Sequence, residues 1–275
     1  MNNINKIKKP KYELIAIDLD DTLIGPELLI SRRNQTAIRH ARDLGVKIVI
    51  ATGRTFTTTL PFIEKLGIHT PAICYQGAEV RTKNNILFYK PLPLKYVKPI
   101  LKIGIENKVQ ILSYIDDIVS LSRPLTQAGR EYLGKIELVK RINIVDFEKY
   151  RFAKAPLKIM FIANRPKTLK MQKETDKIFS GKVYSTLSRS TYLEFLNYDV
   201  SKGKALEFVA KMYRIPMRKV MCIGDSYNDV PMFEEAGLSV AVRNAPSAVE
   251  KRADFVVASE KRDGVAQAIE RFVLS

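Results

Sequence analysis

Short, mainly apolar runs that are followed directly by polar residues recur in the first third of the chain, at residues 14–17, 46–51 and 72–75. Runs of this length are typical of strands buried in a sheet. Between them, apolar residues recur at helical spacing over residues 32–44 and residues 57–66. Ser31 precedes the first of these segments in the position of a helix cap. The alternation predicts a βαβαβ unit with a parallel sheet and right-handed crossovers.

From about residue 83, prolines punctuate the chain, and strand-like runs alternate with helical stretches. The expected strands are residues 110–114, 118–121 and 157–163, and the expected helices are residues 96–106 and 168–179. The regular alternation then returns, with helices expected at residues 203–213, 230–236, 247–251 and 265–272 and strands at residues 219–223, 239–242 and 254–257. The pattern predicts an α/β protein with a doubly wound, Rossmann-like parallel-sheet core at residues 1–86 and 190–275. An α+β domain at residues 87–189 interrupts this core.

Composition narrows the class of protein. With 275 residues, 46% hydrophobic and 27% charged, the chain resembles an ordinary soluble protein, and no segment approaches the roughly 20 apolar residues that span a bilayer. The first residues are polar and basic without the apolar stretch of a secretion signal, so we expect a cytoplasmic protein. Cys74 and Cys222 lie in apolar runs and are expected to be buried. His40 and His69 are too few for a histidine-based site, so acid–base chemistry falls to carboxylates.

The formal net charge of +17 admits several explanations. Residues 91–190 contain 20 basic and 9 acidic residues, so most of the excess lies in the expected insertion. Such an excess can attract nucleic acid or an anionic substrate, or it can be a lysine-rich solvent face. The sequence has no aromatic stacking platform, zinc-ligand pattern or recognisable reading helix, so we expect no nucleic-acid partner. Attraction of a polyanionic substrate and simple solvation both stay open.

Carboxylates follow the first apolar run directly. Asp18 and Asp20 stand at the carboxyl end of an expected parallel strand, where open α/β sheets bind their ligands. Carboxylates so close together favour a hard divalent cation such as Mg²⁺, and one of them can attack an electrophile. The alternative is a solvated acidic turn.

Three later segments place further polar groups at strand or helix ends. The second strand ends in Thr52-Gly53-Arg54, and a helix is expected to begin near Lys202-Gly203-Lys204. A late strand ends in Gly224-Asp225-Ser226-Tyr227-Asn228-Asp229, whose aspartates can face Asp18; its alternative reading is a capped helix start. A lysine beside these carboxylates would offset their charge, and charge alone does not choose between Lys202 and Lys204.

Taken in order, the four segments resemble the four motifs of the haloacid dehalogenase (HAD) superfamily, in the version found in Cof-type (class IIB) phosphatases. The insertion falls between the second and third motifs, where that family carries its α+β C2-type cap domain. Two positions depart from the family pattern. Asp21 stands where the commonest first motif has Gly, and Gln76 stands where the family has Asn before Gly77-Ala78. The role of Gln76 is left open.

The resemblance implies roles for individual residues. Asp18 is the expected nucleophile, Asp20 the general acid and then base, and Lys202 the catalytic cation. The expected Mg²⁺ site comprises Asp18, the backbone carbonyl of Asp20, Asp225, and nearby Ser226 and Asp229. The expected phosphate- and substrate-binding residues are Leu19, Thr52, Gly53, Arg54, Lys202 and Asn228. For Arg54, binding of phosphate or of the rest of the substrate and pairing with a core carboxylate are equally open.

The implied function is Mg²⁺-dependent hydrolysis of a small phosphorylated metabolite, such as a sugar phosphate, nucleotide or cofactor phosphate, through an aspartyl phosphate. The alternatives are a phosphotransferase or phosphomutase of the same superfamily and a basic nucleic-acid-binding protein. A response-regulator receiver uses similar residues but is about half as long and has its phosphoacceptor after the third strand. The carboxylic acid of Asp20 disfavours a dehalogenase and a P-type ATPase. The expected partner is a small phosphoester, without nucleic acid or membrane. The sequence leaves the substrate's identity and the oligomeric state open.

Overall fold

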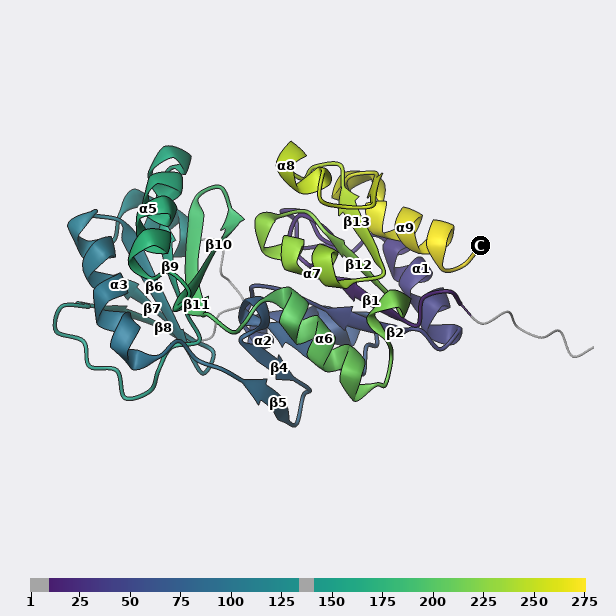
Figure 1. The fold of residues 1–275 in the computed structure, drawn as a ribbon, viewed down its shortest axis with the longest axis horizontal. Coiled ribbons are helices and arrows are strands. Elements are labelled where there is room, and N and C mark those ends of the chain that lie inside the picture. Colours follow the sequence, from purple (N-terminus) through teal and green to yellow (C-terminus); the bar gives the residue numbers. More distant parts are fainter. Residues whose placement is uncertain (1–9, 134–140) are drawn as a thin grey trace, which may run out of the picture.

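A computed structural model describes residues 10–133 and 141–275 (Figure 1). Residues 1–9 of the basic N-terminal segment lie outside the described residues. Within the described ranges, no helix is long and apolar enough to cross a membrane. Cys74 and Cys222 are free thiols in buried strand segments, as predicted. His40 and His69 are both exposed.

The core sheet has five parallel strands in the order β14-β13-β12-β1-β2. Their bounds are β1 Leu14–Ile17, β2 Lys47–Ile50, β12 Val220–Gly224, β13 Leu238–Val242 and β14 Phe255–Val257. The central strand β1 pairs with β12 on one side and β2 on the other, although β12 lies some two hundred residues away along the chain. The carboxyl ends of these three strands therefore meet at one edge of the sheet.

Helices cover both faces of the core sheet, as the doubly wound pattern predicts. The helices are α1 Arg32–Asp43, α2 Phe56–Lys65, α6 Lys202–Met212, α7 Val230–Glu235, α8 Ser247–Glu250 and α9 Gly264–Phe272. Side chains of β1 alternate between two buried clusters. Ile15 and Ile17 join the cluster that includes α1 and α9, whereas Leu14 and Ala16 join the one that includes α6 and α7. Burial on both faces explains why this strand is apolar throughout.

The third predicted core strand lies parallel to the core sheet but is paired with it only briefly. Strand β3 (Ala72–Cys74) forms a single parallel bridge with the segment after β2, between Ala51 and Ile73. It belongs to an antiparallel sheet with β4 (Glu79–Arg81) and β5 (Ile86–Tyr89), neither of which the sequence pattern predicted. The chain reverses because Tyr75 and Gln76 both adopt left-handed backbone conformations, with φ of 49° and 58°.

The insertion forms a six-stranded mixed sheet in the order β10-β11-β9-β6-β7-β8. Its strands are β6 Gln110–Ile115, β7 Ile118–Ser122, β8 Arg141–Val145, β9 Lys158–Ile162, β10 Val183–Arg189 and β11 Tyr192–Asn197, and its helices are α3 Leu94–Glu106, α4 Gln127–Leu133 and α5 Arg165–Ile178. Alternate strand residues such as Ile159 and Phe161 pack with α3 and α5. Their neighbours Met160 and Ile162 join the buried cluster of the core. One face of this sheet therefore carries α3 and α5, and the other faces the core (Figure 1).

Strands of both small sheets lie across the predicted domain boundaries. Strand β11 lies beyond the boundary predicted at residue 189, yet it pairs with β9 and β10 through the hairpin that follows Arg189. Strand β5 extends past the boundary at residue 86 and pairs with β4. The two connections run through residues 90–93 and 198–201, where Lys90 and Asp199 form a 2.6 Å ion pair. The division into two domains itself stays a prediction.

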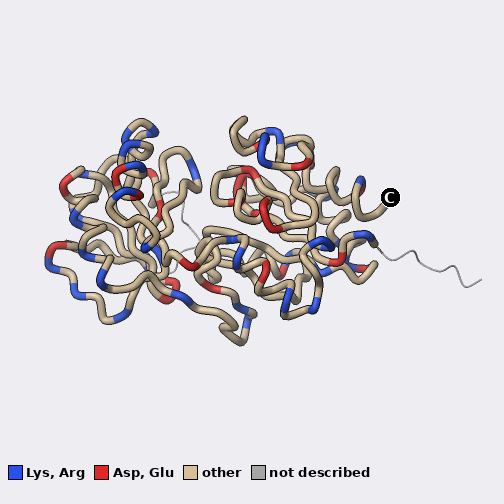
Figure 2. Tube along the Cα trace, in the orientation of Figure 1, with Lys and Arg blue, Asp and Glu red and all other residues tan. Residues whose placement is uncertain are grey.

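Basic residues are frequent on α3 and α5, the helices on the outer face of the second sheet (Figure 2). Lys98 and Lys102 of α3 and Lys170, Lys173 and Lys177 of α5 are all exposed to solvent. These helices cover the face of the sheet that is turned away from the core. This placement favours the solvated-face explanation for these lysines over attraction of substrate.

A buried carboxyl group lies on the three-stranded sheet, near the turn between β6 and β7. Glu79 is 3% exposed, and its Oε1 has no hydrogen-bond partner within residues 10–133 and 141–275. Burial raises the pKa of Glu79 to about 7, since the opposing effect of Arg81 is only partial and Asp117 and Asp116 add to the shift. The site holds this carboxyl group more easily in its protonated form.

We expect Glu79→Gln to flatten the pH dependence of stability. Because the pKa is higher in the folded than in the unfolded protein, the stabilisation by protonated Glu79 is complete below the unfolded value of 4.5 and is lost as pH rises to about 7. The loss reaches about 3 kcal/mol in the free energy of unfolding. Denaturant titrations near pH 5 and near pH 8 measure it, with exposed Glu207→Gln as the control. Equal pH slopes in both variants would contradict this expectation.

Candidate active site

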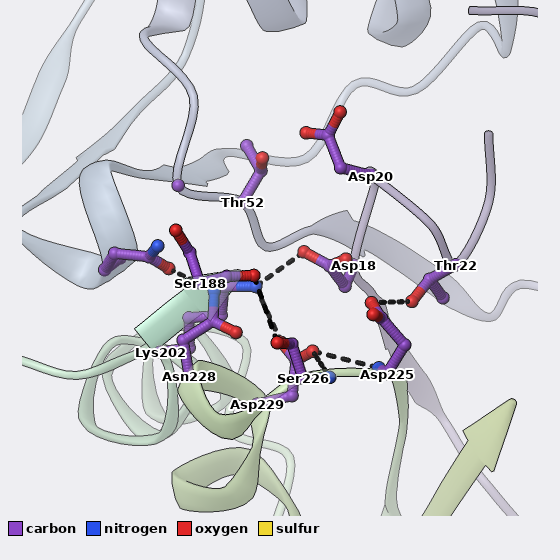
Figure 3. A network of polar contacts seen from close by, with 12 residues as sticks. Asp18, Asp20, Thr22, Thr52, Ser188, Lys202, Asp225, Ser226, Asn228 and Asp229 are labelled. Atoms are coloured by element: carbon purple, nitrogen blue, oxygen red, sulfur yellow. Dashed lines mark hydrogen bonds and ion pairs between the residues drawn. The ribbon is translucent and has the colours of Figure 1, made fainter. Parts of the chain in front are cut away.

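The register of the core sheet brings distant segments together. Ile17 pairs with Ile223 of β12 and with Ile50 of β2, so the residues that follow each strand emerge side by side. The next residues include Asp18 after β1, Thr52 after β2 and Asp225 after β12. Figure 3 shows these residues together with Lys202, which begins α6. These segments lie at one edge of the core sheet, where the sequence pattern placed them.

Lys202 lies between two carboxylates. Its Nζ is 2.5 Å from Oδ1 of Asp18 and 2.6 Å from Oδ1 of Asp229, and its side chain is fully buried (Figure 3). Burial alone would lower the pKa of Lys202, but the two carboxylates outweigh it and raise that pKa, so the ammonium stays charged. Lys204, the alternative from sequence, is exposed on the same helix.

The start of α6 is held close to α7 by Gly203. A Cβ at this position would lie 2.1 Å from the carbonyl oxygen of Pro231, so only glycine permits the contact. Ser201 caps the helix by accepting a hydrogen bond from the N–H of Lys204. Close packing of α6 on α7 therefore explains the glycine after Lys202, and it lets the lysine reach the acidic loop from a buried position.

Asp225 and Asp229 have separate surroundings. Oδ1 of Asp225 accepts a 2.8 Å hydrogen bond from the hydroxyl of Thr22, which joins the first and fourth motifs. Oδ2 of Asp229 accepts hydrogen bonds of 3.0 Å from the N–H groups of Asp225 and Ser226. Asp229 thus holds both the turn and the ammonium of Lys202.

These acids form a candidate metal centre. One oxygen from each of Asp18, Asp225 and Asp229 lies within 4.8 Å of the others, so the three can hold a metal ion. Burial and the neighbouring aspartates raise the pKa of Asp225 well above its ordinary value. Burial also raises the pKa of Asp18, although Lys202 opposes the shift. Three carboxylates facing one ammonium leave negative charge, which a divalent cation with oxygen ligands would offset.

Asp20 is not part of this cluster, and its carboxylate pairs with Arg54 instead. Nε and a terminal nitrogen of Arg54 donate to the two carboxylate oxygens of Asp20 at 2.8 and 2.7 Å. Burial alone would raise the pKa of Asp20, but the hydrogen bonds and charge of Arg54 outweigh it and lower that pKa. Of the roles left open for Arg54, pairing with a core carboxylate is the one seen in this structure.

Asp21 also has a partner, from the second sheet. It adopts a left-handed conformation with φ of 60°, which suits the glycine commonest at this position in the family. Its carboxylate is 2.7 Å from a terminal nitrogen of Arg189, at the end of β10. The aspartate therefore links the loop after β1 to the hairpin between β10 and β11.

The remaining predicted residues lie around the same edge. Leu19 is fully buried, and its carbonyl accepts the N–H groups of Leu23 and Ile24 in the turn of the first motif. The hydroxyl of Thr52 accepts the N–H of Arg54. The amide of Asn228 donates to Gln76, and the hydroxyl of Ser226 donates to the carbonyl of Ser188. The phosphate and metal roles assigned to these residues stay predictions.

Sequence reasoning missed three residues of the second sheet that reach the edge of the core. Lys158 donates to the carbonyl of Gly53 at 2.8 Å, Glu194 accepts from Gln76 at 3.1 Å, and Ser188 receives the hydroxyl of Ser226. Two of these residues could have been found from the sequence, because Lys158 and Glu194 each stand inside an apolar run. A charged residue in a buried strand is rarely found without a partner.

A sequence model of the haloacid dehalogenase-like hydrolases matches residues 15–269. The chain belongs to this family. Its core, its acidic edge and the inserted sheet are thus those of a HAD protein, as the four motifs predicted.

Relatives of known activity extend the assignment. The chain is 32% identical over 264 residues to 5-amino-6-(5-phospho-D-ribitylamino)uracil phosphatase YcsE of Bacillus subtilis, covering 95% of this chain and 96% of the relative. It is 26% identical over 275 residues to pyridoxal phosphate phosphatase YbhA of Escherichia coli, covering 93% and 97%. Its fold matches that of a HAD subclass IIB sugar phosphatase with a TM-score of 0.85 at 22% identity, covering 94% and 98%. The chain is a HAD-type phosphatase with a Cof-type cap, and the predicted enzyme class and fold are confirmed.

We expect Mg²⁺ to raise the melting temperature of the protein and Asp225→Asn to abolish that rise. A cation that binds only the folded state stabilises it by about 2.7 kcal/mol at a hundred times its dissociation constant. In EDTA the variant should be at least as stable as the wild type, because one buried carboxylate is removed and Asn can still accept from Thr22. Thermal denaturation with and without Mg²⁺ measures both effects. Asp43→Asn, at an exposed site, is the control, and an unchanged Mg²⁺ response in Asp225→Asn would contradict the assigned metal centre.

Proposed function

We propose that this HAD phosphatase hydrolyses phosphate monoesters of small metabolites through an aspartyl phosphate on Asp18. The observation that carries the proposal is the contact of Asp18 with the buried ammonium of Lys202, beside Asp225 and within two residues of Asp20. A nucleophilic carboxylate, a fixed cation and a second carboxyl group are the parts that this two-step reaction requires.

In the first step, an oxygen of Asp18 attacks phosphorus, and the bond from phosphorus to the ester oxygen breaks. Asp20 gives its proton to the departing alkoxide. Arg54 holds Asp20 ionised in this structure, so Asp20 must gain a proton before it can act as an acid. A phosphate dianion competes for Arg54, and loss of the ion pair would raise the pKa of Asp20. Arg54 would then pair with Asp20 before substrate binds and contact the phosphate afterwards.

In the second step, ionised Asp20 takes a proton from water, whose oxygen attacks phosphorus and releases Asp18 and inorganic phosphate. Lys202 offsets charge on the phosphoryl oxygens and on Asp18 throughout. Mg²⁺ bound by Asp18 and Asp225 would neutralise a further part of that charge. Both oxygens of Asp229 already accept hydrogen bonds, so we assign Asp229 to holding Lys202 and the turn in place.

The substrate class rests on the relatives. One relative acts on a phosphorylated ribityl-aminouracil and another on pyridoxal phosphate, so both dephosphorylate small metabolites that carry a polar ring. We propose a substrate of the same kind, drawn from sugar phosphates, nucleotides and cofactor phosphates. A panel of such compounds, assayed for released phosphate, would identify it.

We expect Asp18→Asn to reduce kcat/KM for p-nitrophenyl phosphate at least about 1000-fold, because the amide is a poor nucleophile. Asp20→Asn should cost about 100-fold or more through loss of the general acid. The matched control is Asp21→Asn, which changes the adjacent carboxylate that faces Arg189 and should retain activity within about threefold. Released phosphate is measured with Mg²⁺ and with EDTA. More than a tenth of wild-type activity in Asp18→Asn would overturn the proposed nucleophile.

A further inference from the structure

Glu194 of β11 is a buried carboxylate at the contact between the two sheets. It is 2% exposed and accepts hydrogen bonds from three side chains. Oε2 accepts from Nζ of Lys158 and from Nε2 of Gln76, both at 3.1 Å, and Oε1 accepts from the hydroxyl of Ser188 at 2.5 Å. Lys158 and Ser188 belong to the same sheet as Glu194, whereas Gln76 belongs to the core.

Gln76 connects this carboxylate to the fourth motif. Its Nε2 donates to Glu194, and its Oε1 accepts a 2.8 Å hydrogen bond from Nδ2 of Asn228. Gln76 is 1% exposed and Asn228 is 6% exposed, so water does not substitute readily for either contact. The chain of hydrogen bonds thus runs from the cap through Gln76 to a residue in the predicted phosphate-binding set.

Glu194 determines which group donates and which accepts in each of these hydrogen bonds. Glu194, paired with Lys158, carries negative charge and can only accept hydrogen bonds. Gln76 must therefore present its NH₂ group to Glu194, which leaves its oxygen facing Asn228. Asn228 must in turn present its own NH₂ group. Oδ1 of Asn228 has no hydrogen-bond partner among the residues that the structure describes. The orientation of this amide therefore depends on the hydrogen bond that its NH₂ group donates to Gln76.

The same ion pair also contacts the second motif. Nζ of Lys158 donates to the carbonyl of Gly53 at 2.8 Å. Gln76 packs directly on this glycine, since a Cβ on Gly53 would lie 2.4 Å from Nε2 of Gln76. Gly53 and Asn228, on two different motifs, are therefore held by one set of contacts around Gln76 and Glu194.

We propose that Gln76 is a positioning residue that orients the NH₂ group of Asn228 for the phosphoryl group, under control of the buried Lys158–Glu194 pair of the cap. The inference rests on the proposed function, because it assigns phosphate binding to Asn228. Gln76 stands where the family pattern has Asn, and its additional methylene allows it to meet Asn228 and Glu194 at once.

The test replaces Gln76 by Met, which keeps the side-chain length and removes both hydrogen bonds. We expect the KM for p-nitrophenyl phosphate and the inhibition constant of inorganic phosphate to rise together by about tenfold, as for the loss of one well-placed hydrogen bond. Gln76→Asn tolerates the left-handed backbone and keeps one of the two contacts, so we expect a smaller rise in both constants.

The matched control is Gln110→Met on β6. Gln110 is also fully buried, and its side chain bonds Ser122 and Thr126 far from the acidic edge. Its loss should lower the melting temperature and leave the inhibition constant of phosphate unchanged. A purely structural role for Gln76 would give the same result as this control.

The outcomes separate the two proposals. If the wild-type protein releases no phosphate from p-nitrophenyl phosphate or the metabolite panel, the proposed function fails. If the wild type is active and the phosphate inhibition constants of Gln76→Met and Gln76→Asn match that of Gln110→Met, only the positioning role fails. If Gln76→Met does not fold, the comparison of Gln76→Asn with the control decides in the same way.

Discussion

Repulsion among buried carboxylates is the constraint on which this site depends. Asp18 and Asp225 meet at one sheet edge because β1 and β12 are parallel and adjacent, and the turn after β12 brings Asp229 to the same place. Each acid has its own compensating contact: Lys202 for Asp18, the Thr22 hydroxyl for Asp225, and Lys202 with two backbone N–H groups for Asp229. One ammonium does not balance three carboxylates, and a phosphate dianion would add to the excess. A divalent cation held by these oxygens would offset this excess charge.

The candidate site could be predicted from sequence to the extent that it depends on strand ends. An apolar run followed by Asp18, Thr52 or Asp225 locates the residue at the carboxyl edge, whatever the rest of the fold. The partner of Arg54 could not be predicted in this way, because it depends on which side chains approach across the edge. The same holds for Lys158 and Glu194, whose strands reveal a buried charge but not the residue that it faces.

The fold was predictable where periodicity is long and regular, and less so where a few residues redirect the chain. The reversal from strand β3 into β4 was not predicted, because it depends on left-handed conformations of Tyr75 and Gln76 that neither residue type signals. The hairpin of β10 and β11 was missed because its turn, after Arg189, contains no glycine or asparagine. The boundaries predicted at residues 86 and 189 accordingly divide strand β5 and the hairpin of β10 and β11.

The contacts between cap and core differ in what their loss would cost. Separation of the sheets would remove the hydrogen bonds from Gln76 to Glu194 and from Lys158 to Gly53. The Lys158–Glu194 pair lies within the cap sheet, so separation would leave neither charge buried without its partner, which is the expensive case. Arg189 and Asp21 are partly exposed, and such a pair contributes about 1 kcal/mol or less. Loss of these polar contacts by itself thus costs little, and the Lys158–Glu194 pair stays intact within the cap sheet. The larger cost of separation is the exposure of apolar residues such as Met160 and Ile162, which pack with the core.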